Sequence, residues 1–524
     1  MVGYFLIRCV WVMNYGAKLT AFHPILTIKL NPKKFKKMTN KLNFLTFLKL
    51  INLLFFALFL IFQNHAKASK SSDQIHQNIE EPQTLKLSQI LESTHKNYPQ
   101  ILNFYEKVAV KEGKILESKG FFDVKIKNQY QDKTRGFYDG KINDISIEKQ
   151  NGFLGSKIYG GYRKSFGNFA DYDGNNFTND GGEYRVGASV SLLRNRAIDE
   201  GRLDLITSKL ELKESQAQLE KVKNEIARDA TKSYWNWVVA GYIYQTYNEL
   251  YELAKKRDEQ LKIRHQKGDI AQIILTENHR NVLNRQSLAQ EAKNNFENSA
   301  IALSMYYRDT NSIMMIAELN QLPKIDFGYN FETNYDVKKD IEFAIENRPE
   351  LRILRVQIEQ ENSNLLQAKN FYQPKLDLQF EASKDLGDGP KTRSQANNQV
   401  KLDFEFPLQQ NVAKGKIASA SSKIKAIQYE EIFYRDKIKN EISQLGNSIQ
   451  NILQIYKNYL EELKLSQILE KAEKERFAHG HSDFFLINLR EQEVASAKIN
   501  KFIAFLKYQN FIADYQMAIF RNHH

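Results

Sequence analysis

Asn97-Tyr98-Pro99, followed by Lys119-Gly120-Phe121-Phe122, is the stretch that decides the fold, because the chain contains it twice. The second copy lies 250 positions later, as Asn347-Arg348-Pro349 followed by Lys369-Asn370-Phe371-Tyr372. A repeat of this length indicates a duplicated structural unit. Asn97 with Pro99, and Asn347 with Pro349, are expected to mark helix breaks, because proline lacks the backbone N–H that a helix interior needs.

The two copies continue beyond this stretch with a smaller offset, between 212 and 216 positions. The first copy therefore contains about 36 additional residues, which fall within 134–184. This segment is rich in Gly, Asn, Asp and Tyr and is predicted to be a long surface loop. The matched positions are Leu193 and Leu408, Gly201 and Gly415, and Gly268 and Gly480.

Residues 1–68 have the pattern of a secretory signal peptide. An apolar run from Leu50 to Phe62 is preceded by lysines and followed by Ala66-Lys67-Ala68, a small-x-small cleavage pattern. Met38 would give a leader of ordinary length, so residues 1–37 are interpreted as a misassigned start. Residues 69–84 are predicted to be an N-terminal linker.

Removing this leader changes the charge of the chain from +13 to +3, because 65 basic residues then face 62 acidic ones. The high pI therefore gives no indication of nucleic-acid binding. The single cysteine, Cys9, also lies in the leader. We expect an exported protein without disulfides and without a lipid anchor on cysteine.

Two long segments of each copy have the composition of helices. No proline lies between Pro99 and Pro323 or after Pro407, and Glu, Lys, Gln, Ala and Leu are abundant in these stretches. The sequence predicts a long helix over 197–266 with a return helix over 270–308, then a long helix over 412–479 with a return helix over 482–520. In the second copy, apolar residues alternate spacings of four and three, a coiled-coil pattern, at Ile438, Ile442, Leu445, Ile449, Ile452, Tyr456, Tyr459 and Leu463.

Four shorter segments alternate apolar and polar residues, as strands do when one face meets lipid and the other meets water. They lie near 122–131 and 184–192 in the first copy, and near 375–383 and 399–406 in the second. The structural repeats are thus predicted over 85–322 and 337–524, with a linker over 323–336. Four strands cannot close a barrel, so several chains must pool their strands if these lie in a membrane.

The sequence contains no Walker loop, dinucleotide fingerprint, His-Glu-x-x-His motif or cysteine-based metal spacing. We therefore expect no enzymatic activity, no cofactor and no metal site.

The order of these features resembles that of the TolC-like outer membrane efflux proteins. The chain gives helix, Asn-x-Pro, helix, strand, loop, strand, Leu-Leu or Pro-Leu, long helix, glycine break and return helix, twice over. The resemblance implies a mainly α-helical protein with a transmembrane β part. In this family three chains each donate four strands to one twelve-stranded β-barrel, which a periplasmic α-helical barrel continues.

The resemblance also implies a function, a location and partners. The function is a passive trimeric channel for efflux or type I secretion, in the outer membrane of a Gram-negative bacterium with a large periplasmic part. The partners are two further copies of the chain, the lipid bilayer, a periplasmic adaptor protein and an inner-membrane transporter of RND, ABC or MFS type, with no nucleic acid. The alternative is a soluble periplasmic coiled-coil adaptor or structural protein without a pore.

The resemblance places the periplasmic tip and gate at the two glycine breaks. Where family members often carry acidic residues after the second glycine, this chain has Leu486 and Leu489, and its nearest acids are Asp483, Glu491 and Glu493. For any one of these charges the expectation is a solvated position on a helix face, with Arg490 as a partner for either glutamate. The candidate tip and gate residues are Gly268, Asp269, Gly480, His481, Asp483, Arg490 and Glu491.

Overall fold

The computed structural model describes residues 84–325 and 335–521. The predicted signal peptide over 1–68 lies outside these residues, as does the 69–84 linker up to residue 83. Residues 326–334 of the predicted 323–336 linker also lie outside.

The repeated Asn-x-Pro motif forms the same joint between two helices in each copy. Helix α3 (Leu87–Asn97) ends two residues before α4 (Pro99–Lys119), and α7 (Val337–Asn347) ends two residues before α8 (Pro349–Phe371). Each proline occupies the first helical position, where its missing N–H leaves no helix hydrogen bond unmade. The residue between the two helices is extended, with ψ of 120° at Tyr98 and 131° at Arg348.

Each copy then contains one very long helix and one return helix. In the first copy these are α5 (Glu200–Gln266) and α6 (Gln272–Ser304), and in the second they are α9 (Asn411–Ala478) and α10 (Phe484–Ile519). Helix α5 begins after Asp199, whose carboxylate accepts a hydrogen bond from the backbone N–H of Arg202 at 2.8 Å.

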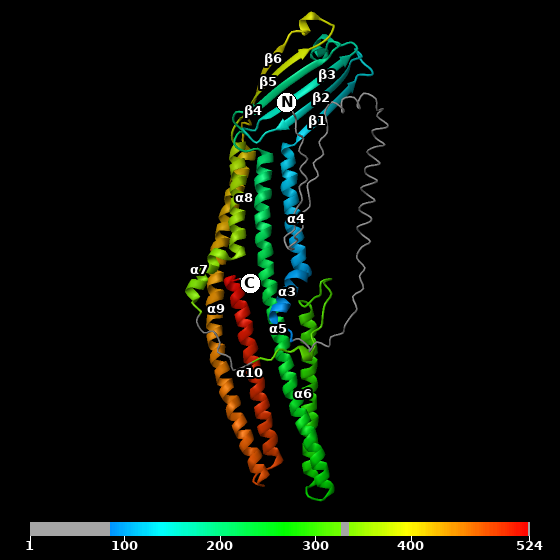
Figure 1. Ribbon diagram of the computed structural model, residues 1–524. Helices are drawn as coiled ribbons and strands as arrows, with labels where there is room; N and C mark the ends of the chain where they lie inside the picture. The colour runs from blue at the N-terminus through cyan, green and yellow to red at the C-terminus, as the bar shows by residue number, and fades with distance from the viewer. Residues whose placement is uncertain (1–83, 326–334, 522–524) are drawn as a thin grey trace, which may run out of the picture. The chain divides into compact units, whose positions relative to one another are not determined.

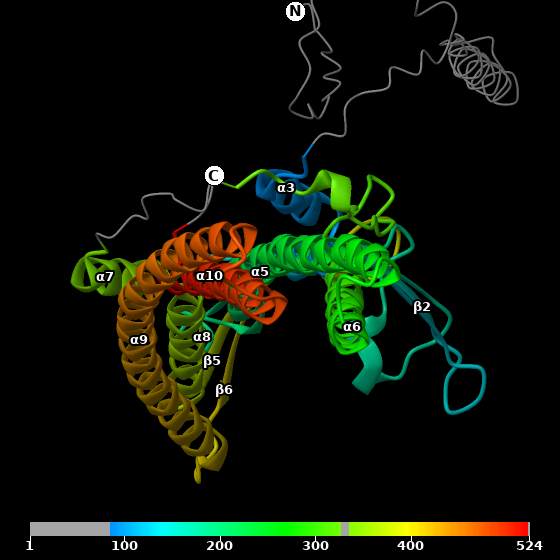
Figure 2. The ribbon, with the colours of Figure 1, turned by 90° about the horizontal axis from the view of Figure 1, so that it is seen from below.

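The helices lie side by side in rows of four (Figures 1 and 2). Near the sheet the order is α4, α5, α8, α9, and toward the helix-to-helix turns it is α6, α5, α10, α9. Helix α5 is therefore an inner helix at both levels. Helices α4 and α6 form one edge of the row, and α9 forms the other.

The predicted apolar stripe of α9 forms the largest core cluster. Ile442, Ile449 and Tyr456 of this stripe are buried and pack with α8 and with the aromatic side chains of α10. A second cluster joins α5 to α3 and α6 through Tyr234 and Trp237. Burial of such large apolar side chains contributes roughly 1.5–3 kcal/mol each. The core therefore lies along the middle of the helices.

The sheet contains six antiparallel strands in sequence order, not the predicted four (Figure 1). Two of them, β2 and β3, lie within residues 134–184, so the prediction of a surface loop there is wrong. The connection between β3 and β4 keeps a loop character and contains the short 3-10 helix η2 (Asp171–Asn176). The strands are β1 (Val124–Asp132), β2 (Lys141–Gln150), β3 (Lys157–Phe166), β4 (Glu183–Ser191), β5 (Lys375–Asp385) and β6 (Asn397–Glu405).

The composition of the additional hairpin explains why the sequence did not predict it. Strand β3 carries Gly160 and Gly161 at its centre, and glycine in a strand usually signals a turn or a bulge. Strand β2 has the polar pair Asn143 and Asp144 between its isoleucines. The strand pattern emerges only when the cross-strand partners are known.

The remaining repeat markers lie where the sheet meets the long helices. Leu193 and Leu408 are exposed between a strand and the following long helix. The Phe121 ring occupies the space that a Cβ atom on Gly201 would need, so this glycine lets the short 3-10 helix η1 (Gly120–Phe122), which follows α4, approach the start of α5 closely. Its counterpart Gly415 has no neighbouring atom within 4 Å of that position.

Candidate functional site

The sheet has one mainly apolar face and one polar face. Cross-strand partners lie on the same face, and the register aligns Ile126 with Ile147, and Ile147 with Gly160. The same alignment continues through β4, β5 and β6. The apolar face thus carries, as exposed side chains, Val124, Ile126, Tyr130, Ile145, Ile147, Ile158, Tyr184, Val186, Phe380, Val400, Leu402 and Phe404.

The opposite face carries most of the charge. Every strand contributes to it, and the lysines on the apolar face lie toward strand ends, as at Lys141 and Lys149. Exposure of an apolar face of this extent to water is unfavourable, whereas a lipid layer would cover it. The charged polar-face residues include Lys125, Lys127, Asp144, Glu148, Arg163, Glu183, Arg185, Asp377, Glu381, Lys401, Asp403 and Glu405.

Among residues 84–325 and 335–521, both edges of the sheet are unpaired, since β1 pairs only with β2 and β6 only with β5. The helices at the two edges also expose apolar side chains, such as Leu116 on α4, Ile301 on α6 and Phe433 on α9. Sheet edge and helix edge therefore coincide on each side, with β1, α4 and α6 on one side and β6 and α9 on the other. Unpaired edges of this kind are templates for pairing with another chain.

The predicted tips are two turns with the same backbone geometry. Gly268 has φ +83° and Gly480 has φ +78°, in the left-handed region that favours glycine. The N–H of Gly268 donates to the carbonyl of His265 at 2.9 Å, and that of Gly480 donates to Phe477 at 3.0 Å. The next N–H donates back to Arg264 in the first turn and to Arg476 in the second, completing a Schellman motif in each.

The other residues predicted for the tip are mostly exposed. Asp269 and His481 are exposed and each follows its glycine. The Asp483 carboxylate caps α10 by accepting a hydrogen bond from the N–H of Leu486 at 2.9 Å. Arg490 pairs with Glu493 at 2.8 Å rather than with Glu491. Asp483 thus has a structural role in starting the helix.

Glu491 is the one predicted tip residue that is fully buried, so the expectation of a solvated charge is wrong for it. Only 2% of Glu491 and 1% of Arg285 are exposed. The carboxylate of Glu491 on α10 accepts hydrogen bonds from Arg285 on α6, at 3.1 Å, and from Arg257 on α5, at 3.0 Å. The sequence around Glu491 does not identify its partners, because they lie 206 and 234 positions away.

This ionic cluster, defined as Arg257, Arg285, Glu491 and Asn488, joins three helices from both repeats. Arg285 also donates to the carbonyls of Leu250 at 3.2 Å and of Asn488 at 3.3 Å, and Arg257 donates to the Asn488 side chain. Two guanidinium groups face one carboxylate, so the cluster has a net positive charge. Burial lowers the pKa of Arg285, although Glu491 opposes this effect, and arginine stays charged at any pH that a protein tolerates.

A second polar contact lies between α5 and α6 closer to the first tip. The buried Asp258 carboxylate accepts hydrogen bonds from Asn278 at 3.0 Å and pairs with Lys262 at 2.7 Å. Burial alone would raise the pKa of Asp258, but the hydrogen bonds from Lys262 and Asn278 outweigh it, so this pKa lies below its ordinary value. Polar contacts thus add to the apolar ones that hold α5 to α6 here.

The spacing of residues offered a signal for these buried polar groups. On α6 the buried positions Asn278, Val282, Arg285, Ala289 and Ala292 alternate spacings of four and three. On α10, Glu491 follows Ile487 by four positions and precedes Val494 by three. A charged or amide side chain at such a seam position is unusual and indicates a buried polar contact.

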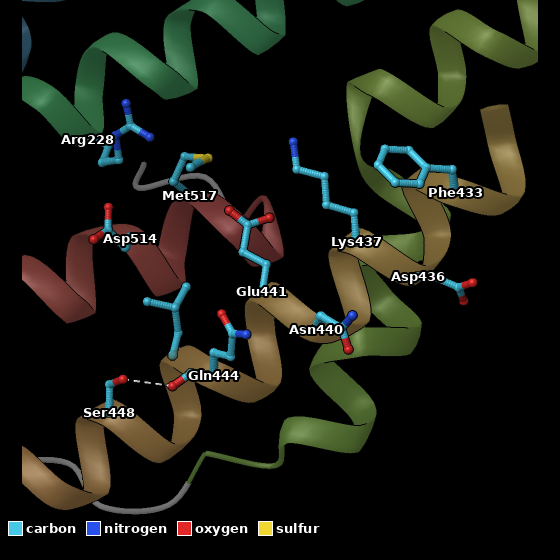
Figure 3. A pocket seen from close by; sticks show the side chains of 11 residues that line it. Arg228, Phe433, Asp436, Lys437, Asn440, Glu441, Gln444, Ser448, Asp514 and Met517 are labelled. Atoms are coloured by element: carbon cyan, nitrogen blue, oxygen red, sulfur yellow. Dashed lines mark hydrogen bonds between the residues drawn. The ribbon is translucent and has the colours of Figure 1, made fainter.

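A groove of about 590 Å³ lies beside the end of α10, between α5 and α9 (Figure 3). Arg228, Lys437 and Met517 are among the side chains that line it. Its carboxylates have partners outside the groove, since Asp514 pairs with Lys232 at 2.6 Å and Glu441 with Arg348 at 2.7 Å. None of the predicted tip residues lines this groove.

Within residues 84–325 and 335–521, no group of His, Cys, Asp and Glu side chains has the arrangement needed to hold a metal ion. In the same ranges, no helix combines the length and the apolar character required to cross a membrane.

A search of protein-family models and a search of curated proteins found no match. Among solved structures, the open-state MtrE outer membrane channel of Neisseria gonorrhoeae matches with a TM-score of 0.59 at 11% identity, over 86% of this chain and 97% of MtrE. The CmeC outer membrane channel of Campylobacter jejuni matches with a TM-score of 0.57 at 15% identity, over 86% of this chain and 92% of CmeC. The outer membrane protein VceC of Vibrio cholerae matches with a TM-score of 0.57 at 10% identity, over 83% and 95% of the two chains.

The chain therefore has the fold of a protomer of the TolC-like outer membrane channels, as its sequence predicts. The likeness extends over 92% to 97% of the three matched chains. Because the sequence identities are only 10% to 15%, this structural similarity establishes the fold alone.

Proposed function

We propose that this chain is one subunit of a passive homotrimeric channel in the outer membrane of a Gram-negative bacterium. The main observation behind the proposal is the sheet, because most of its apolar side chains lie on one face and most of its charged side chains lie on the other. Such a sheet fits a barrel wall with lipid outside and water inside. The likeness to outer membrane channels at TM-scores of 0.57 to 0.59 supports the same conclusion.

The two edges of the chain support assembly into a closed ring. The β1, α4 and α6 edge of one copy would meet the β6 and α9 edge of the next, a head-to-tail contact that closes when the rotation between copies allows it. Closure removes the open sheet edges, which cannot exist in lipid. The number of copies, three, comes from the resemblance to TolC-like proteins.

The channel would serve efflux or type I secretion and would take its energy from elsewhere, because the sequence carries no nucleotide-binding motif. The two tips at Gly268 and Gly480 are exposed helical turns. These turns would form the surface that contacts a periplasmic adaptor protein and an inner-membrane transporter of RND, ABC or MFS type.

The ionic cluster is our candidate for the contact that keeps the tips closed. It ties α10 of the second repeat to α5 and α6 of the first through a carboxylate that is almost fully buried. Movement of one helix pair away from the other would break this cluster. E491Q is expected to raise single-channel conductance, whereas D483N, which alters only the α10 cap, is expected to leave it unchanged.

The decisive experiment extracts the protein from isolated outer membranes and records planar-bilayer currents from the purified oligomer. Detergent-dependent trimers with discrete conductance steps would support the channel. Release of a monomer by salt or buffer alone, with no current, would refute it and favour the soluble periplasmic coiled-coil protein.

A further inference from the structure

The additional hairpin, β2 with β3, is a full part of the sheet. Strands β2 and β3 have ten residues each, comparable to the nine of β1 and β4. Membrane-spanning strands typically need about 9–11 residues. The pairing runs without interruption from β1 through β2 and β3 to β4. The hairpin also keeps the division between faces, with Ile145, Ile147 and Ile158 on the apolar side.

Two contacts on the polar face reach across a strand and tie the hairpin to its neighbours. Arg185 on β4 reaches over Gly161 of β3 to the carboxylate of Asp144 on β2. A Cβ atom at Gly161 would lie 3.2 Å from the Arg185 Nε and 2.9 Å from the carbonyl oxygen of Ile145. Glycine is thus the residue that fits beneath the arginine.

Tyr159 on β3 makes the matching contact in the other direction. Its ring covers Gly187 of β4, and its hydroxyl donates to Glu381 on β5 at 2.6 Å and accepts from Gln379 at 2.7 Å. Four consecutive strands, β2 to β5, are therefore linked by side chains in addition to the backbone ladder. A hairpin that merely lay against the sheet would have no reason to carry these contacts.

The turn between β2 and β3 is also fixed against the start of α5. The N–H of Asn151 donates to the carbonyl of Ser156 at 2.7 Å, which closes the turn. The N–H of Ser191 donates to the carbonyl of Leu154 at 3.3 Å, and Arg202 of α5 donates to the carbonyl of Gly152 at 3.4 Å. The hairpin is thus held at its helix-side end as well as along its length.

From these observations we infer that the ring of three chains closes an eighteen-stranded barrel, three times the six strands of one chain, instead of a twelve-stranded one. The inference rests on the proposed trimer. Because the insertion has two strands, β6 still runs opposite to β1, so β6 of one copy meets β1 of the next copy in antiparallel orientation. An insertion with an odd number of strands would have reversed the direction of every later strand, and β6 would then run parallel to β1 of the next copy.

The additional strands widen the outer membrane part without adding helices. Barrel diameter grows roughly in proportion to strand number, so eighteen strands give a diameter about 1.5 times that of twelve. Barrels of 16–18 strands leave an aqueous channel. The outer membrane exit would therefore pass any cargo that the helical part admits, and the narrowest point would lie in the helices.

The inference is tested by disulfide cross-linking between neighbouring copies, since Cys9 of the leader is the only native cysteine. Cysteine is placed on the polar face of β6, at Gln399, Lys401, Asp403 or Glu405 in turn. Each is combined with Lys127→Cys on the outer strand β1 or with Lys157→Cys on β3. A disulfide requires Cα atoms within about 7 Å, so it forms only between adjacent strands.

A third pair within one chain joins Lys127→Cys to Ser146→Cys, which are register partners on β1 and β2. Oxidised trimers that are linked through a Lys127→Cys variant and through none of the Lys157→Cys variants, together with a disulfide in the Lys127→Cys/Ser146→Cys pair, would support eighteen strands. Trimers linked through Lys127→Cys without that intrachain disulfide would mean that β1 does not pair with β2 and that the hairpin lies outside a twelve-stranded barrel. Links through Lys157→Cys would mean that β3 is the edge strand and that β1 and β2 lie outside a twelve-stranded barrel. A conducting trimer with no link in either series would also overturn the inference. A chain that never forms trimers would instead refute the proposed function, so the two failures are distinguishable.

Discussion

The substitution Glu491→Gln isolates the electrostatic contribution of the ionic cluster. Glutamine keeps the size of the side chain and one acceptor oxygen, but it leaves Arg257 and Arg285 without a counter-charge where Arg285 is 1% exposed. Removal of one partner from a buried ion pair costs about 3–5 kcal/mol. Because glutamine still accepts one hydrogen bond, we take about 3 kcal/mol, the lower end of that range. This corresponds to a roughly 100-fold shift in the equilibrium that docks α10 on α5 and α6.

The assay is hydrogen exchange of the purified protein, measured on peptides that cover residues 486–500. Exchange there is expected to be about 100-fold faster in E491Q, because exchange under native conditions follows the local opening equilibrium. Glu493→Gln is the matched control, two positions away on the same helix, since Glu493 is 40% exposed and pairs only with Arg490. Its expected cost is about 0.5 kcal/mol, or roughly twofold.

A second variant separates charge from packing. Adding Arg285→Met to E491Q removes one of the two uncompensated guanidinium groups and is expected to restore part of the protection. Equal exchange rates in E491Q and E493Q would refute the reasoning. A fast rate in E491Q that Arg285→Met leaves unchanged would show that the loss is not electrostatic.

Three further predictions concern acid stability, the tips and the lipid-facing wall. The pKa of Asp258 is lower in the folded chain than in the unfolded chain, where it is near 3.9, so ionised Asp258 adds stability above that pH. This stability is lost as the pH falls through the folded-state pKa, so hydrogen exchange in α6 should accelerate below about pH 4. The acceleration should be absent in D258N. Gly480→Ala should lower the free energy of unfolding by about 1–2 kcal/mol, because φ is positive at that residue. Gly415→Ala, in an open helical position, should instead stabilise α9 by up to about 1 kcal/mol. Thermal unfolding of both variants checks this contrast. Leu402→Arg on the apolar face of β6 should cost about 2–4 kcal/mol and reduce insertion into outer membranes, whereas Gln399→Arg on the polar face should insert normally.

The duplication and the helix joints could be predicted from the sequence because they depend on local chemistry. Pro99 and Pro349 fix their helix starts wherever they occur, and Gly268 and Gly480 adopt a backbone conformation that other residues rarely take. The apolar stripe of α9 was equally visible because its partners repeat at helical spacing. These features therefore follow from short stretches of sequence.

The β2–β3 hairpin and the ionic cluster could not be predicted in the same way, because their meaning depends on residues far away in the chain. Gly161 looks like a loop residue until Arg185 is seen to pass over it. Glu491 looks like a surface charge until two arginines from other helices are found around it. In both cases the role of the residue depends on a contact partner that the neighbouring sequence does not identify.

Apolar and polar residues are unevenly distributed along the surfaces where the helices pack, and this affects how easily the packed helices can separate. In the middle of the helices, separation would expose Tyr456 and Phe502 to water, and such a change proceeds only with a large loss of stability. Toward the turns, the buried residues include the charged groups Asp258, Arg285 and Glu491 beside apolar ones such as Leu261 and Val494, and water can solvate the charged groups once they part. We therefore expect separation of the helices to cost less free energy at this end than in the middle, and we expect the salt concentration to affect the two regions differently.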